Sequence, residues 1–286
     1  MKDQVLYQAI IDRYSVRQYE QKPLSSQQVD LVNALISQSQ PIVMDNKIEY
    51  LQFHEINTMD LLVAQGPYGA FVTSQDALVP YTVSERFPLV EVGFQAQQVV
   101  VGLFQAGIGS CYLGTAGREQ SVIRHFDLPI NAKVGASLMI GIPKEDALRS
   151  IANYFRQPGH KTKRLVLEDI YAEGEFGQSA AAPDSLVEVM TAAQRAPSAV
   201  NAQPWRFVKA DDWLYLYVMP KVYPFVLSQR HKMTYVLHDA GIVMANIWLA
   251  YQALGISREW VMYDLDDAGF PACPKDALPV AKIAIN

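Results

Sequence analysis

Arg13, Ser15 and Arg17 alternate along a short segment near the start of the chain. In an extended segment, alternate side chains point to one side, so two guanidinium groups and a hydroxyl can converge on one ligand. Guanidinium suits phosphate because its planar fork donates two charge-assisted hydrogen bonds at once. The spacing therefore predicts a site for a small anion. A solvated run of charge is the alternative interpretation of the triplet taken alone.

A rigid loop of small and polar residues occupies positions 197 to 207, far along the chain. Its two prolines fix the backbone angle φ, and Ser198 and Asn201 offer short-range hydrogen bonds. Ala199 leaves room for a ring to approach closely. This composition predicts a wall against which a planar ligand can lie. A simple turn between a helix and a strand is the alternative.

The elements that must position these motifs occur twice. Residues 92–108 and 240–256 both read as helices with a glycine near the start and Gly-Ile at the end, where glycine is the favoured terminator. A β-like run that contains Ala-Lys follows each of them, at 132–141 and at 281–285. The chain therefore looks internally duplicated.

The upstream elements repeat more weakly. A capped helix is predicted at 24–36, with Ser25 or Ser26 as the N-cap, and a second one at 183–195. Residues 206–210 and 213–218 predict a β-hairpin, whose counterpart in the first half is a strand near 50–56. Residues 153–177 read as a connector between the halves.

The basic triplet, the loop at 197–207 and the segment at 107–114 together resemble the nitroreductase family of FMN enzymes. In that family the flavin lies between two intertwined subunits, and each site takes residues from both. Here almost the whole first half of the chain separates the two motifs. This displacement resembles the branch of the family, of the TM nitroreductase type, in which a single chain mimics the dimer.

The resemblance implies an α+β fold of two pseudo-symmetric halves, residues 1–165 and 166–286, intertwined around one shared core. Each half would hold a central mixed or antiparallel β-sheet flanked by helices. The resemblance also implies roles for four groups of residues in binding FMN. They are Arg13, Ser15 and Arg17 for the phosphate, ribityl and pyrimidine side, Leu113, Gly114 and Thr115 for the N5 edge through backbone amides, Lys163 and Arg164 for the phosphate, and Pro197, Ser198, Ala199 and Asn201 for the opposite wall.

Departures from the family pattern indicate one FMN per chain. Where the first half should have its own Pro-Ser-x-x-Asn loop, residues 37–46 keep one proline and little else. Where the second half should have a basic triplet, residues 174–180 contain no Arg or Lys. One of the two sites expected of a dimer is therefore complete, and the other lacks both walls.

By resemblance, the predicted function is an FMN-dependent oxidoreductase that uses NAD(P)H to reduce a small planar electrophile, a nitroaromatic or a quinone, by ping-pong exchange. No side chain is predicted to act as catalytic acid or base, and Arg17 would support the reduced flavin electrostatically. Other flavin chemistry on the same site, dehalogenase-like or oxidase-like, is one alternative. A flavin-binding protein without turnover is another, and the choice between NADH and NADPH stays open.

The composition of the chain limits the classes of partner that it can be expected to bind. The formal charge of -5 over 286 residues excludes a protein whose main partner is nucleic acid, since that needs clustered positive charge. The two cysteines lie far apart and no ligand spacing is present, so no metal site is predicted. No signal peptide or membrane span is indicated, which favours a cytoplasmic protein. Fused halves favour a monomer, with a homodimer as the alternative.

Overall fold

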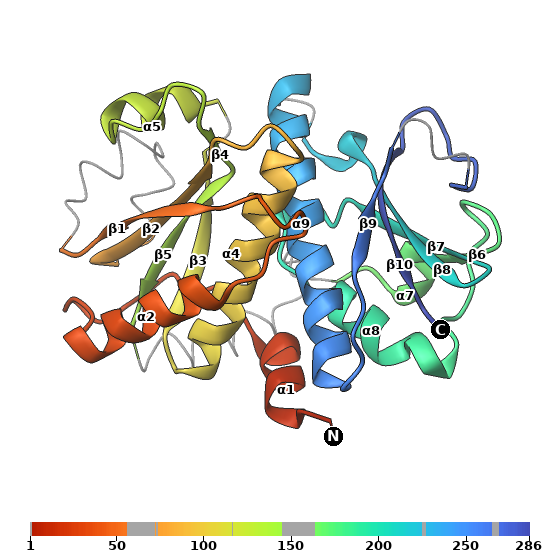
Figure 1. The fold of residues 1–286 in the computed structure, drawn as a ribbon, viewed down its shortest axis with the longest axis horizontal. Helices are drawn as coiled ribbons and strands as arrows, with labels where there is room; N and C mark the ends of the chain where they lie inside the picture. The colour runs from red at the N-terminus through yellow and green to blue at the C-terminus, as the bar shows by residue number, and fades with distance from the viewer. Residues whose placement is uncertain are drawn as a thin grey trace. The chain divides into compact units, whose positions relative to one another are not determined.

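The computed structural model describes residues 2–55, 72, 74–115, 117–144, 164–224, 227–264 and 269–286. Contacts divide the chain into two compact units (Figure 1). We call residues 12–163 the N-unit, and residues 1–11 together with 164–286 the C-unit. The first eleven residues thus group with the second half of the chain. The proposed boundary between residues 165 and 166 stays a prediction.

A five-stranded sheet with helices forms the N-unit. The strand order is β1-β2-β5-β3, all neighbours are antiparallel, and β4 pairs with β2. The elements of this unit are α2 (Ser26–Gln38), β1 (Glu49–Phe53), β2 (Asp76–Thr82), α4 (Pro88–Gln105), β3 (Gly109–Gly114), α5 (Glu119–His125), β4 (Lys133–Val134) and β5 (Ala136–Gly141).

Both faces of this sheet are buried. Leu78, Leu138 and Ile140 pack in one cluster with apolar residues of α2 and α4. On the opposite face, Met139 packs with residues of the segment that holds the basic triplet, including Tyr19. The sheet therefore supports that segment directly from its core.

A second five-stranded sheet forms the C-unit, in the order β6-β7-β8-β10-β9. Only the pair β6 and β7 is parallel. The elements of this unit are α1 (Gln4–Asp12, up to Ile11), α7 (Leu167–Ile170), β6 (Tyr171–Glu173), α8 (Asp184–Arg195), a 3-10 turn (Ala199–Asn201), β7 (Trp205–Ala210), β8 (Trp213–Val218), a second 3-10 turn (Pro220–Val222), α9 (Gln229–Ala253), β9 (Trp260–Met262) and β10 (Leu278–Ala284).

Helix α9 is the central helix of the C-unit, and most of its residues from Val236 onward are buried. A helix that is apolar on all sides can be stable only inside a core. It contacts α8 and β8, and the indole of Trp260 in β9 donates a hydrogen bond to Met244 O at 3.1 Å. Helix α1 joins the same unit because Asp3 N donates to Ala253 O at 2.6 Å.

One predicted connector carries more structure than expected. Within its described part, residues 171–173 form β6, an edge strand paired with β7, rather than a linker. Tyr171 and Ala172 are buried. The short apolar run was too brief to be recognised as a strand from its pattern.

The predicted duplication is visible in the topology. The order β1-β2-β5-β3 in the N-unit repeats as β7-β8-β10-β9 in the C-unit, antiparallel throughout. Helices α4 and α9 also end alike, on Gly107 with φ 74° and Gly255 with φ 76°. The isoleucine after each glycine donates its N–H back to the helix, at 2.9 Å in both cases. The predicted α+β fold of two related halves is confirmed.

Within the described residues, none of the helices is both long enough and apolar enough to span a bilayer.

Candidate functional site

The segment with the basic triplet lies along the edge of β3 in the N-unit. Ser15 forms a parallel bridge with Ser110, and Val16 N donates to Ser110 O at 2.9 Å. The approach is close enough that a Cβ on Gly109 would lie 2.7 Å from the side chain of Val16. The buried side chain of Tyr19 also holds the segment in place, because its hydroxyl donates a hydrogen bond to Val16 O at 2.7 Å. The sheet therefore fixes the backbone from which the triplet projects.

The three side chains of the triplet differ in exposure. Arg13 is only 7% exposed, and its Nε has no hydrogen-bond partner among the residues that the structure describes, whereas Ser15 is half-buried and Arg17 is exposed. Burial lowers the pKa of Arg13. A buried guanidinium nitrogen without an acceptor is costly, and an anionic ligand would relieve that cost. This donor set fits the phosphate or the pyrimidine edge of a flavin.

The second predicted group lies at the far end of β3. Leu113 is buried and Gly114 is exposed at the last position of the strand. Thr115 is fully buried, and its hydroxyl donates to Gly135 O at 3.0 Å. Because that hydroxyl is already used, contacts from this group to a ligand would come from backbone amides, as the sequence predicts.

The loop after α8 forms the predicted wall in the C-unit. Val200, Asn201 and Gln203 have φ of 50°, 56° and 49°, a left-handed backbone that costs a non-glycine residue of order 1 kcal/mol or more. Such strain persists only where surrounding contacts impose it. Inside the loop, Ser198 Oγ accepts the N–H of Gln203 at 2.9 Å. The side chain of Ser198 therefore shapes the turn.

Arg164 clamps this loop onto the end of α8. Its Nη1 donates to Ala196 O at 2.8 Å and to Asn201 Oδ1 at 3.0 Å, and its Nη2 donates to Arg195 O at 3.1 Å. Helix C-terminal carbonyls attract a cation. Arg164 thus lies beside the predicted wall, with contacts that fix it there, and its predicted phosphate role stays a prediction. Lys163 lies outside the described residues.

Sequence reasoning missed a buried anchor of the same loop. Asp239 in α9 is 2% exposed, and its Oδ2 accepts Ala199 N at 2.9 Å and the hydroxyl of Tyr223 at 2.6 Å. Burial and the neighbouring carboxylate raise the pKa of Tyr223 well above its usual value. The available signal was a lone acidic residue in an otherwise apolar stretch of helix.

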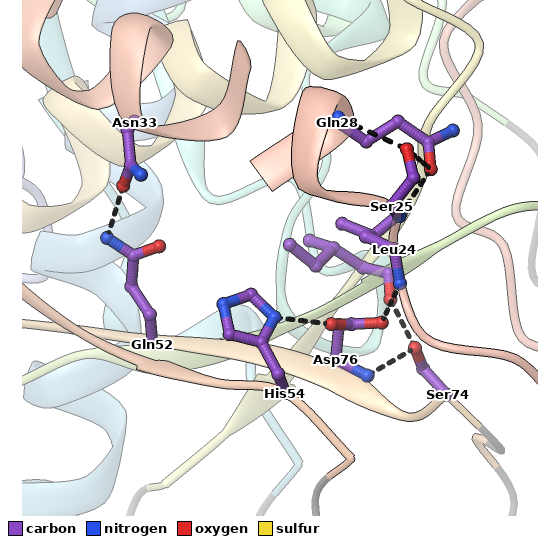
Figure 2. Close-up of polar contacts among 9 residues, drawn as sticks. Leu24, Ser25, Gln28, Asn33, Gln52, His54, Ser74 and Asp76 are labelled. Atoms are coloured by element: carbon purple, nitrogen blue, oxygen red, sulfur yellow. Dashed lines mark hydrogen bonds and ion pairs between the residues drawn. The ribbon is translucent and has the colours of Figure 1, made fainter. Parts of the chain in front are cut away.

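A polar cluster around Asp76 joins the end of β1 to the start of β2 in the N-unit (Figure 2). Asp76 is fully buried, and its carboxylate pairs with His54 Nδ1 at 2.7 Å and accepts Leu24 N at 2.9 Å. Figure 2 shows the imidazole and Ser74 on opposite sides of Asp76. The hydroxyl of Ser74 instead donates to Ile140 O. The three side chains therefore do not form a nucleophile-base-acid relay, and the cluster tethers the chain before α2 to the sheet.

Comparison with known proteins places the chain in a family. Residues 5–251 match the protein family described as "Putative TM nitroreductase". The chain belongs to this nitroreductase family. Membership supports an oxidoreductase, and members of the nitroreductase family generally use a flavin.

One solved structure shares the fold of this nitroreductase-family chain over its full length. A "putative nitroreductase" from Thermotoga maritima covers 100% of this chain and 96% of its own, with TM-score 0.59 and 16% identity. An FMN-dependent nitroreductase from Clostridium difficile covers 48% of this chain and 87% of its own, with TM-score 0.43 and 14% identity. A "putative NADH dehydrogenase/NAD(P)H nitroreductase" from Bacteroides thetaiotaomicron covers 48% of this chain and 86% of its own, with TM-score 0.43 and 21% identity. A comparison with curated proteins gives no match.

Proposed function

We propose that this chain is an FMN-dependent oxidoreductase that takes electrons from NAD(P)H and reduces a small planar electrophile, a nitroaromatic or a quinone. The observation that carries the proposal is the basic segment held against β3, where the buried Nε of Arg13 finds no acceptor in the described part of the chain. Family membership supports the same cofactor class. The loop of residues 197–203 would supply a wall for the planar ring.

The N-unit would contribute hydrogen-bond donors and positive charge to ligand binding, and the C-unit would contribute a fixed surface. Arg13, Ser15 and Arg17 offer hydrogen-bond donors and positive charge for an anionic ligand, and the exposed end of β3 at Gly114 offers backbone amides. The strained backbone at Val200 and Asn201 offers a fixed, small-residue surface. Because such groups are already in place before a ligand arrives, binding pays little for reorganisation.

A bound flavin would supply the redox chemistry, by accepting a hydride from NAD(P)H and returning two electrons to the oxidant. The oxidant would gain two electrons and two protons: one proton would arrive with the electrons as a hydride and the other could come from water, so the chain need not provide an acid. Arg17 would stabilise the negative charge that accumulates on reduction, because its guanidinium is a positively charged donor on the exposed side of the segment. Exchange of nicotinamide and oxidant at one face would give ping-pong kinetics.

We further propose one flavin per chain. The first-half loop of residues 41–46 offers only one proline of the Pro-Ser-x-x-Asn pattern. A surface hollow of about 230 Å3 adjoins it, lined by Asp45, Lys47, Glu49, Thr82, Val83 and Ser84. Two carboxylates against one ammonium make this hollow a poor receptor for a phosphate.

The test is a flavin titration of the purified protein, followed by removal of the excess and an absorbance spectrum. We expect one FMN per chain, bleached by NAD(P)H without oxygen, and a monomer by light scattering. Arg17→Ala should lower turnover far more than flavin affinity, since its charge acts mainly in the reduced state. Two flavins per chain would contradict the single site, and bound flavin without any bleaching would favour a carrier without turnover.

A further inference from the structure

The central helices of the two units each carry one buried carboxylate at the corresponding position. Glu91 precedes Val92-Gly93 in α4, and Asp239 precedes Ala240-Gly241 in α9. Glu91 is 0% exposed and Asp239 is 2% exposed. Charged side chains are rarely buried to this extent unless several donors satisfy them. Both carboxylates must therefore have partners that justify their burial.

In the N-unit, the partners of Glu91 come from the loop that leaves α2. Its carboxylate accepts Val43 N at 2.7 Å and Ile42 N at 3.2 Å. The side-chain amides of Asn46 and Gln95 donate to the same carboxylate, at 3.3 and 3.1 Å. Glu91 thus holds the backbone of the loop between α2 and β1.

In the C-unit, Asp239 does the same for the loop that leaves α8. Its Oδ2 accepts Ala199 N, one residue before the left-handed turn begins at Val200. Tyr223 donates to the same oxygen from the segment after β8, and its ring stacks on Tyr235 with centroids 5.9 Å apart. The anchor position is therefore common to both halves, but of the two loops only the one in the C-unit has the Pro-Ser-x-x-Asn spacing of the predicted flavin wall.

We propose that Asp239 is a positioning residue for the flavin wall, and that Glu91 is its counterpart on a loop that has no ligand to position. This inference rests on the proposed function. Asp239 holds Ala199, and with it the strained turn of Val200 and Asn201, in the conformation that accepts the ring. Removal of the charge weakens the hydrogen bond from Ala199, and the turn relaxes toward an unstrained backbone.

The experiment compares Asp239→Asn with the matched variant Glu91→Gln in the full chain. Both changes replace a buried carboxylate by its isosteric amide, and they do so at corresponding positions. FMN affinity is read from the quenching of flavin fluorescence, and the mobility of the loop from hydrogen exchange at the amide of Ala199. We expect Asp239→Asn to raise the FMN dissociation constant roughly tenfold, the value of one charge-assisted hydrogen bond, and to speed exchange at Ala199. Glu91→Gln should change both by less than about twofold, since it touches a different loop.

Several results separate the inference from the proposed function. If the unmodified chain binds no flavin, the proposed function is wrong whatever Asp239 does. If it binds flavin and the two amide variants behave alike, the inference alone is wrong. If Asp239→Asn does not fold, Tyr223→Phe removes one donor from the same oxygen and leaves the carboxylate in place. Faster exchange at Ala199 with weaker FMN binding in that variant supports the inference, and no change in either overturns it.

Discussion

Replacement of Arg164 by methionine tests how the predicted flavin wall is held. The change keeps the length and apolar character of the side chain and removes three hydrogen bonds, at 2.8, 3.0 and 3.1 Å. Hydrogen bonds from a charged donor contribute about 1.5–3 kcal/mol when buried, but this side chain is only half-buried and one of the three bonds is exposed. About 1 kcal/mol for each of the two inner bonds and less for the outer one gives a loss of roughly 2–3 kcal/mol.

Tryptophan fluorescence is a selective assay for this loss. All four tryptophans, Trp205, Trp213, Trp248 and Trp260, belong to the C-unit. Urea unfolding followed by their emission therefore reports the unit that holds Arg164. Arg230→Met is the matched control, because Arg230 is exposed in the first turn of α9, and its replacement should change the free energy of unfolding by no more than about 0.5 kcal/mol. Equal unfolding midpoints for the two variants would refute the clamp.

Riboflavin distinguishes a clamp from a phosphate ligand. Riboflavin lacks the phosphate, so a residue that binds only the phosphate affects FMN affinity and leaves riboflavin affinity unchanged. A residue that shapes the wall affects both. We expect Arg164→Met to weaken the binding of FMN and of riboflavin by the same factor, because the hydrogen bonds from Arg164 to Ala196 O, Asn201 Oδ1 and Arg195 O hold the loop and the end of α8. A selective loss of FMN binding would instead support the phosphate role that the sequence predicts.

Three further outcomes are expected from side chains in the described part of the chain. Asp76→Ala removes the acceptor of one backbone N–H and the partner of one histidine, and should cost about 2–4 kcal/mol by thermal unfolding, whereas Asp45→Ala, at an exposed site, should cost less than about 0.5 kcal/mol. Lys282→Met removes an ammonium that lies 5.3, 6.0 and 5.4 Å from three aromatic ring centres, and should lower the stability of the C-unit by about 1 kcal/mol in the tryptophan-monitored unfolding. Burial raises the pKa of Glu91 above its usual 4.5, so the pH-dependent part of its contribution to stability is fully present below that pH and is lost as the pH rises through the folded-state pKa. The free energy of unfolding of the unmodified chain minus that of Glu91→Gln should therefore fall with rising pH, and a constant difference would contradict the raised pKa.

Local signals predicted the elements that depend on neighbouring residues. Ser25 caps α2 and Gln28 completes the capping box, with Gln28 Oε1 accepting Ser25 N at 2.9 Å, because both partners lie within one turn of helix. The hairpin of β7 and β8 was equally readable, since the Asp-Asp turn and the alternation of side chains act over a few residues. The glycine ends of α4 and α9 belong to the same class, because the αL conformation is local.

Contacts between distant parts of the chain could not be read in this way. The partner of β1 is β2, whose run of apolar residues follows only after a long interval and carries no turn signal beside it. Arg164 and Asp239 reach the loop of the predicted flavin wall from opposite directions in the sequence, 37 and 40 residues from their partners. Nothing in the residue pattern distinguishes a basic residue that clamps a loop from one that binds a phosphate, because both need the same guanidinium.

The comparison of the two units explains why one predicted site can decay while both folds remain. Loss of Glu91 would leave the N–H groups of Ile42 and Val43 without their acceptor, and loss of Asp239 would do the same to Ala199, so each anchor contributes to stability whether or not a ligand is present. The predicted ligand groups are different, because an exposed side chain such as that of Arg17 contributes little to folding. Ligand residues can therefore change in one half with little effect on the stability of its fold. Loss of the carboxylate under the loop would lower that stability. A retained anchor consequently indicates that the loop conformation is retained, and does not indicate that the ligand site is. Whether the site is retained depends on the residues of the loop that would contact the ligand.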